Sequence, residues 1–583
     1  MQSLVGLARL EAAEGNWDEV LRLTQHRVQL APRDPDAQVQ FVDALLLVRR
    51  PGDSLKAAAA ARQALAGVAP ALLQLTAREA VGQAVMGSWD AARHSLQQVP
   101  GDLMRAVLRQ LDLQPAGHPA DTAALYVRYA AATFGDGEWI FARALPQMLR
   151  ALLSRPQAAS PGAWLAANVI APALALEEVE IAHIRAHADA ARPRGNFPPL
   201  DLQPTGDHRL RIAWLMPRLD GDGVADALAE RLQVHDRRQF ALYVYTQTPQ
   251  PRPATQAALR AATDGLIDVA HLADAELVAR IRLDQPHLLI DLAADTPDAR
   301  PCVAAARVAP VQTRATRGWP AGQAGGAYDA EWCDAFSQPV EVSGAQQVTL
   351  QHLGMADPLH SHGILPRPLI RTAPGHCPPP EAAGFIFGVA APADHIDPDS
   401  FALWMRVLQV ASGAQMAFFG LTPAAAHRMR RHARQQGIDA GRLRIARPGE
   451  PATFDLLLDP LRRSAAVAVA QAIAEGRPVL SCAAAARASR PGAALLMAAG
   501  LQAWICRDAH DYQQRAIDIA TDPAGHWPAL KAQADAARAS ATDRRAASTA
   551  EVESVWRALI ERSATTRRTA RSDASFTPPP PAP

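Results

Sequence analysis

The sequence predicts an α-helical N-terminal region followed by two α/β domains, each with a parallel sheet covered by helices. Three observations lead to this prediction. Residues 1–115 contain helical segments with an internal repeat, and residues 208–540 alternate short β-branched and aromatic runs with helical segments. A Pro-rich break at 364–382 divides the alternating part into two series. At roughly 150 residues per domain, a chain of 583 residues has room for this arrangement.

The N-terminal region, residues 1–115, carries the repeat. The sequence GNWD at 15–18 recurs as GSWD at 87–90, and a weaker copy begins at Gly52, which gives spacings of 37 and 35 residues. Prolines stand where the second helix of each unit is expected to end: Pro32, Pro70 and Pro100. The region resembles a short, divergent tetratricopeptide array, which implies a concave surface for a protein partner. The alternative is an irregular helical domain without a ligand.

Residues 116–207 are predicted to be a helical spacer that ends in a linker. The segment 190–209 is rich in Pro and Gly, which is typical of a linker. His183 and His187 lie four residues apart on one predicted helix, a spacing that can hold a metal ion. They are not part of an HExxH pattern, so we expect no metal there.

The two α/β domains are expected at 208–375 and 376–540. The first has predicted strands at 210–216, 240–246 and 287–293. The second has predicted strands at 385–390, 414–420, 443–447, 454–459 and 478–482, and predicted helices at 398–411, 424–437 and 465–476. In doubly wound domains, ligands bind at the carboxyl ends of the strands, so we expect a cleft there between the domains.

The final segment, 541–583, is predicted to contain a helix around 549–562. From Arg568 onward the sequence is too polar and Pro-rich to be expected to fold.

Composition excludes several classes of protein. Basic and acidic residues number 59 and 58, so no overall charge attracts nucleic acid or a membrane surface. We expect no membrane span, because no apolar run reaches about 18 residues, and no signal peptide. The five cysteines form no CxxC pair, which argues against a disulfide framework and a zinc ribbon. We therefore expect a cytoplasmic protein.

Lysine is almost absent. Only Lys56 and Lys531 are lysines, so arginine supplies the other 57 basic residues, a bias typical of GC-rich bacterial genomes.

Several segments resemble, in order and with nearly gapless spacing, the O-GlcNAc transferase/SPINDLY family. Those similar to its C-terminal catalytic half are 387–408, 430–446, 456–482 and 488–505. Those similar to its N-terminal half are 210–216, 307–312 and 318–322. The resemblance covers about residues 208–540. It implies a GT-B fold, two Rossmann-like halves preceded by tetratricopeptide-like helices. It also implies metal-independent transfer of N-acetylglucosamine from UDP-GlcNAc, or of fucose in the plant branch, to Ser or Thr of proteins.

The resemblance also implies a donor site, but this sequence differs at each of its positions. The His-Thr-Thr of the family's phosphate loop falls on Ala466, Val467 and Ala468. The ribose-binding Asp falls on Gln471, and the phosphate-binding lysine falls on His395.

In the N-terminal half, the family's His near the reacting centre falls on Asp222, and a second polar position falls on Asp295. Asp222 is a candidate catalytic residue, and the alternative is a turn residue among glycines.

These substitutions predict weak activity. Losing one hydrogen-bond donor that stabilises the transition state costs about 2–4 kcal/mol, so two or three losses lower the rate about 10⁴-fold or more. Backbone N–H groups at the helix start survive any side-chain change. Arg462, Arg463 and Arg490 are candidate phosphate ligands, although the first two are alternatively solvated loop charges. His395 is a cation only when protonated, and is alternatively a surface residue.

We therefore expect a GT-B protein similar to protein O-glycosyltransferases, with a nucleotide-sugar donor and weak or altered activity. One alternative is a catalytically inactive scaffold that binds a protein partner through its helical repeats. Another is an active transferase whose different donor is held by arginines. Because neither lysine lies in the predicted cleft, donor phosphates there must be held by arginine, protonated histidine or backbone.

Overall fold

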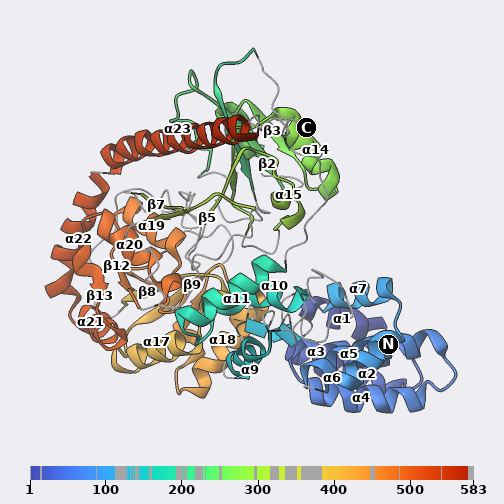
Figure 1. Ribbon diagram of the computed structural model, residues 1–583. Coiled ribbons are helices and arrows are strands. Elements are labelled where there is room, and N and C mark those ends of the chain that lie inside the picture. Colours follow the sequence, from blue (N-terminus) through green and yellow to red (C-terminus); the bar gives the residue numbers. More distant parts are fainter. Residues whose placement is uncertain are drawn as a thin grey trace, which may run out of the picture.

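The computed structural model comprises a helical region and two sheet-containing halves (Figure 1). It describes residues 2–13, 16–86, 88–111, 144–156, 161–191, 206–216, 232–247, 253–294, 299–315, 327–334, 351–355, 384–446, 453–484, 486–539 and 541–574, with isolated positions at 126–127, 129–130, 133–134, 137, 139, 200 and 228–229. In this part of the chain, no helix combines the length and the apolar character needed to cross a membrane.

The N-terminal region consists of consecutive helices. They are α1 (Gln2–Ala13), α2 (Trp17–Leu30), α3 (Pro35–Leu47), α4 (Pro51–Ala64), α5 (Ala69–Val85), α6 (Trp89–Gln97) and α7 (Gly101–Gln110). The repeated motif recurs at the start of every second helix: α2 and α6 begin with its tryptophan, and α4 begins one residue before Gly52. Pro32 and Pro100 lie in the turns after α2 and α6, whereas Pro70 lies in the first turn of α5.

The spacer is also helical and has its own apolar core. Its helices are α9 (Ala144–Ser154), α10 (Pro161–Ile170), the short 3₁₀ helix η2 (Ala171–Ala173) and α11 (Glu178–Ala190). His187 of α11 stacks on Trp164 with ring centroids 4.5 Å apart. Burial lowers the pKa of His187, and the neighbouring His183 adds to this effect. His187 therefore packs as a neutral ring.

The N-terminal sheet lies in the half that follows the spacer. Its strands are β1 (Leu210–Leu215), β2 (Phe240–Thr246), β3 (Gly265–Asp268), β4 (Leu288–Asp291), β5 (Val311–Ala315), β6 (Ala330–Asp334) and β7 (Gln351–Met355). Among the described helices of this half are α13 (Pro253–Ala262), α14 (Asp274–Asp284) and α15 (Pro301–Ala305). The strand order is β3-β2-β1-β4-β5-β6-β7, and neighbouring strands are parallel.

The C-terminal sheet repeats this topology. Its strands are β8 (Ile386–Ala390), β9 (Gln415–Phe419), β10 (Leu443–Ile445), β11 (Leu456–Leu458), β12 (Val479–Cys482) and β13 (Ile505–Cys506). The main helices are α17 (Pro398–Val410), α18 (Pro423–Gln435), α19 (Ala466–Glu475), α20 (Pro491–Ala498), α21 (Ala509–Thr521) and α22 (Pro523–Ala539). The order β10-β9-β8-β11-β12-β13 matches the doubly wound dinucleotide-binding pattern. The predicted fold class is confirmed.

Sequence reasoning missed several strands, and β5 shows why. Gln312, Thr313 and Arg314 are polar, yet each is 0% exposed. Gln312, for example, donates to the carbonyl oxygens of Ala304 and Ala327. Such a strand lacks the apolar run that marks a buried strand, because its side chains find hydrogen-bond partners in the folded chain.

The last helix, α23 (Ala541–Ala574), returns from the C-terminal half to the N-terminal half (Figure 1). Trp556 is 2% exposed and packs edge-on against Trp214 of β1 and Phe240 of β2, with centroids 5.5 and 5.3 Å away. The helix is longer than the predicted 549–562. It also continues past Arg568, so the expectation of an unfolded tail is wrong up to Ala574.

Candidate functional site

The predicted donor residues meet at the switch point of the C-terminal sheet. Strands β8 and β11 are parallel neighbours, but the chain continues from them to opposite sides, toward β9 and β12. The loops that follow β8 and β11 therefore diverge and leave a position for a ligand. The first loop contains His395, the second contains Arg462 and Arg463, and α19 begins directly afterwards at Ala466.

The turn between β11 and α19 is fixed by a residue that the sequence prediction did not include, Asp459. This residue is 1% exposed. Its Oδ1 accepts the backbone N–H of Ala465 at 2.7 Å, and its Oδ2 accepts the hydroxyls of Ser464 at 2.8 Å and Ser481 at 2.6 Å. Burial raises the pKa of Asp459 to about 6, although these hydrogen bonds oppose the shift. The sequence pattern that could have identified this residue is an aspartate directly after an apolar strand and shortly before a helix.

The start of α19 offers backbone donors. The helix has no side-chain cap, since position 465 is alanine. Ala468 N–H donates to the carbonyl of Ala465 at 2.8 Å. Ala466 and Val467 are partly exposed and lie in the first turn, where N–H groups have no intrahelical acceptor. These two amides and the positive end of the helix dipole are what an anion would meet here.

The two arginines of the turn bind carboxylates from the neighbouring loop. Arg462 Nη2 lies 2.6 Å from Asp399 Oδ2, and Arg463 Nη1 lies 3.0 Å from Asp394 Oδ2. The guanidinium of Arg462 also lies 3.5 Å from Asp397, which is 1% exposed. These arginines therefore carry charges that are already balanced by aspartates, so a diphosphate would have to compete with these carboxylates.

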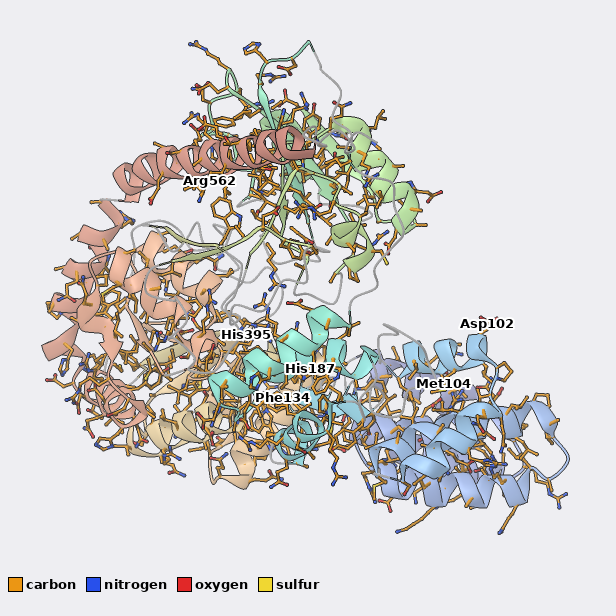
Figure 2. All side chains as sticks on the ribbon, viewed as in Figure 1. Asp102, Met104, Phe134, His187, His395 and Arg562 are labelled. Atoms are coloured by element: carbon orange, nitrogen blue, oxygen red, sulfur yellow. The ribbon has the colours of Figure 1, made fainter. Side chains whose placement is uncertain are left out.

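His395 is half-buried at the end of a short 3₁₀ turn, η3 (Ala393–His395). Figure 2 shows it on the side of the C-terminal half that faces the N-terminal half. Burial opposes ionisation of the adjacent Asp394, but the charges of Arg463 and His395 outweigh it and lower the pKa of that carboxyl. Trp139 of the spacer supports this loop, because its indole N–H donates to the carbonyl of Ile396 at 3.1 Å.

The remaining residues that were predicted to bind the nucleotide-sugar donor lie around the same turn. Arg490 directly precedes α20, and its Nε donates to the carbonyl of Ala484 at 3.2 Å. Ala468 and Gln471 are 1% and 2% exposed, inside α19. A ribose contact at Gln471 stays a prediction, and the buried position means that only a ligand reaching into the helix packing would touch it.

Helix α11 contacts both halves of the protein. At its start, Glu178 Oε2 accepts the backbone N–H of Arg487 at 3.0 Å, in the loop before α20. Near its end, Asp189 pairs with Arg314 of β5. Arg314 also lies over the ring of Tyr328, at 5.4 Å. The loop that carries Arg487 is therefore held from the spacer as well as from its own domain.

Some predicted residues lie outside the described part of the chain. They are Asp222 and Asp295, the candidates in the N-terminal half. Within the described residues, no group of three or more His, Cys, Asp or Glu side chains is arranged to hold a metal ion.

The two lysines lie elsewhere. Lys56 is on α4, where it is 3.4 Å from Asp53, and its side chain is 83% exposed. Lys531 is on α22, where it pairs with Asp535. Neither belongs to the loops that follow β8 and β11.

Comparison with solved structures shows the same fold in an O-GlcNAc transferase. A lysine-to-methionine mutant of the Thermobaculum terrenum enzyme matches with a TM-score of 0.60 and 20% identity, over 97% of this chain and 98% of that chain. A UDP-N-acetylglucosamine 2-epimerase matches over 56% of this chain and 91% of that one, with 12% identity and a TM-score of 0.31. The glycotransferase of kitacinnamycin matches over 60% and 99%, with 12% identity and a TM-score of 0.32. No family model and no curated protein sequence matches the chain.

Proposed function

We propose that the chain is similar to protein O-glycosyltransferases in function as well as in fold. It would bind a nucleotide sugar at the turn between β11 and α19 and transfer the sugar, weakly or with an altered donor, to a hydroxyl of a protein. One observation carries the proposal. The residues that match the family's donor site all gather at the switch point of the C-terminal sheet, in a fold shared with an O-GlcNAc transferase along 97% of this chain.

The site chemistry supports binding more than fast transfer. The amides of Ala466 and Val467 remain available to a diphosphate, and Arg463 is a nearby cation that could help if it leaves Asp394. The family's hydroxyls and lysine are replaced by alanine, valine and His395. Each missing donor costs about 2–4 kcal/mol of transition-state stabilisation. We therefore expect turnover about 10⁴-fold or more below that of an intact site. The proposal includes no metal cofactor.

Calorimetric titration with UDP, GDP, UDP-GlcNAc and GDP-fucose tests the proposal. We expect one of these ligands to bind in the millimolar range or tighter. No heat with any of them at several millimolar would reject both the donor site and the transferase function. Mass spectrometry of a Ser- and Thr-rich acceptor peptide, incubated with the bound sugar nucleotide, then measures transfer.

Arginine variants test which groups hold the phosphates. The combined change Arg462→Ala, Arg463→Ala and Arg490→Ala should lower nucleotide affinity at least tenfold. Arg406→Ala is the matched control, since Arg406 is exposed on α17 and bonds to Gln513, away from the turn. Unchanged affinity of the triple variant would reject the arginines as phosphate ligands and leave the backbone amides and His395.

A second candidate function, a catalytically inactive scaffold, is favoured by the balanced charges at the turn and by the contact between the helical region and the C-terminal half. Arg428 of α18 is 4% exposed and donates to the carbonyl of Leu47 at 2.9 Å, and His427 lies 3.4 Å from Asp18. The helical region is thus joined to the α/β half and would present a partner next to it.

Affinity capture with the full chain separates the two functions. The double change Leu10→Ser and Leu30→Ser alters residues that are 64% and 58% exposed on the helical region, and should abolish partner capture by a scaffold. Leu283→Ser, at a residue 75% exposed on α14, is the control. Equal capture by both variants would count against the scaffold function.

A further inference from the structure

The carboxylate of Asp459 connects the starts of two helices. Its Oδ1 holds Ala465, the residue before α19, by the backbone N–H. Its Oδ2 accepts the hydroxyl of Ser464, whose oxygen in turn accepts the backbone N–H of Gly492 in the first turn of α20 at 2.8 Å. A single buried side chain is therefore linked to the first turns of both α19 and α20, to the second through Ser464.

The fit around this carboxylate leaves no spare room. A Cβ at Gly492 would lie 2.3 Å from Asp459 Oδ2 and 2.7 Å from Ser464 Oγ. Position 492 must therefore be glycine because of close approach, not because of an unusual backbone angle. On the opposite side, Ser481 of β12 donates its hydroxyl to the same Oδ2, which fixes the carboxylate against the sheet.

We infer that Asp459 is a positioning residue for the anion site: it sets the separation between the first turns of α19 and α20, and it holds the turn before α19 so that the amides of Ala466 and Val467 face one diphosphate. The inference rests on the proposed function. Asp459 is 1% exposed, and we expect it to act through the turn without touching the ligand. Its bonds go to Ala465 and to two hydroxyls, which leaves the amides of Ala466 and Val467 for the ligand.

Asp459→Asn tests the inference with little change in shape. The amide oxygen can still accept the N–H of Ala465, but one acceptor oxygen is replaced by a donor, so the bonds to Ser464 and Ser481 cannot both persist unchanged. We expect UDP affinity at pH 8 to fall at least tenfold, while the circular dichroism spectrum stays that of the wild type. Hydrogen–deuterium exchange should accelerate in both 464–468 and 490–494.

Ser464→Ala is the second variant, and it keeps the test decisive if the Asn variant does not fold. It cuts only the link from Asp459 to Gly492, so it should reproduce the loss of UDP affinity. Because both changes break the same connection, their effects on affinity should not add in the double variant. Ser95→Ala is the matched control, since it also removes one serine hydrogen bond, to Gln83 in the helical region outside the turn, and should lower affinity less than threefold.

The two hypotheses fail in different ways. If the wild-type protein binds no nucleotide, the proposed function is wrong, while the exchange rates of 464–468 and 490–494 still report on the role of Asp459. Wild-type UDP affinity, or unchanged exchange in both segments of the folded Asn and Ala variants, would overturn the inference. Faster exchange in the 464–468 segment alone would also overturn it, because the coupling to α20 would then be absent.

Discussion

Asp189 of α11 and Arg314 of β5 form a buried ion pair, with Arg314 Nη1 3.2 Å from Asp189 Oδ1 and side chains 3% and 0% exposed. At the other end of α11, Glu178 binds the backbone of Arg487 in the C-terminal half. Eleven residues separate the two contacts, about 16 Å along a helix. One helix of the spacer therefore touches both halves, and both contacts are electrostatic.

Removing one member of this pair should be costly. Asp189→Ala leaves the guanidinium of Arg314 buried without its carboxylate, and we expect it to lower the free energy of unfolding by about 3–5 kcal/mol. The double change Asp189→Leu and Arg314→Met should cost less than the single one, because no charge stays buried. Urea unfolding of the full chain measures both. A double variant that is as unstable as Asp189→Ala would contradict this explanation.

An exposed pair provides the comparison. Asp535→Ala breaks the pair with Lys531, in which the aspartate side chain is 48% exposed. We expect it to change the free energy of unfolding by less than about 1 kcal/mol.

Trp556 should anchor α23 to the N-terminal half. Trp556→Ala removes a ring that is 2% exposed and packs against Trp214 and Phe240, so we expect a loss of about 3–5 kcal/mol. Limited proteolysis should then cut α23 and the N-terminal half faster than the C-terminal half. Glu561→Ala, at an exposed position of the same helix, serves as the control. Equal proteolysis of both variants would show that the helix is held elsewhere.

Asp459 should make stability depend on pH in a defined direction. Its pKa is raised from 3.8 to about 6 by burial, so between pH 4 and 6 the native carboxyl keeps a proton that the unfolded chain releases. The contribution of Asp459 to the free energy of unfolding is therefore greatest below pH 4. It falls by about 3 kcal/mol in total as the pH rises through 6. Burial also raises the pKa of the nearby Tyr512 and Cys482, the latter to about 11, so neither titrates in this range.

The Asn variant at position 459 lacks this titration. The free energy of unfolding of the Asn variant minus that of the wild type should therefore increase by about 3 kcal/mol between pH 4 and pH 7, because only the wild type loses stability over this range. Urea unfolding at four or five pH values measures the difference. A constant difference across this range would mean that Asp459 stays ionised in the native protein.

Trp139 should stabilise the loop that carries His395. Trp139→Phe keeps an aromatic ring against Phe401 and His432 but removes the donor to the carbonyl of Ile396. We expect a loss of about 1–3 kcal/mol and faster hydrogen–deuterium exchange in 393–397. Trp139→Ala should cost more, because it also removes the ring packing. A Phe variant as stable as wild type, with unchanged exchange, would show that this hydrogen bond contributes nothing.

The order of strands and helices could be predicted wherever the buried residues are apolar. In β8 four consecutive residues are buried and apolar or glycine, which gives an unambiguous signal. The strand β5 was missed because its buried Gln312 and Arg314 depend on partners that lie far away in the sequence. Local patterns contain no information about such partners.

The location of the candidate site was predictable in the same limited sense. The positions of His395 and Arg463 follow from their place after two parallel strands. The ion pair of Arg463 with Asp394 joins residues 69 positions apart, and the hydrogen bond from Ser481 to Asp459 joins residues 22 apart. Which partners a polar side chain finds is decided when the elements pack, so neither the balanced charges of the turn nor the role of Asp459 followed from spacing.

The placement of the two lysines gives the protein a natural pair of chemical handles. Lys56 lies on the helical region and Lys531 on α22, and they are the only side-chain amines in the sequence. After the α-amino group is blocked, amine-reactive fluorophores would thus attach one dye to each part without any engineered cysteine. Energy transfer between the dyes would then follow how far the helical region stands from the C-terminal half, and whether a nucleotide or a partner protein changes that separation.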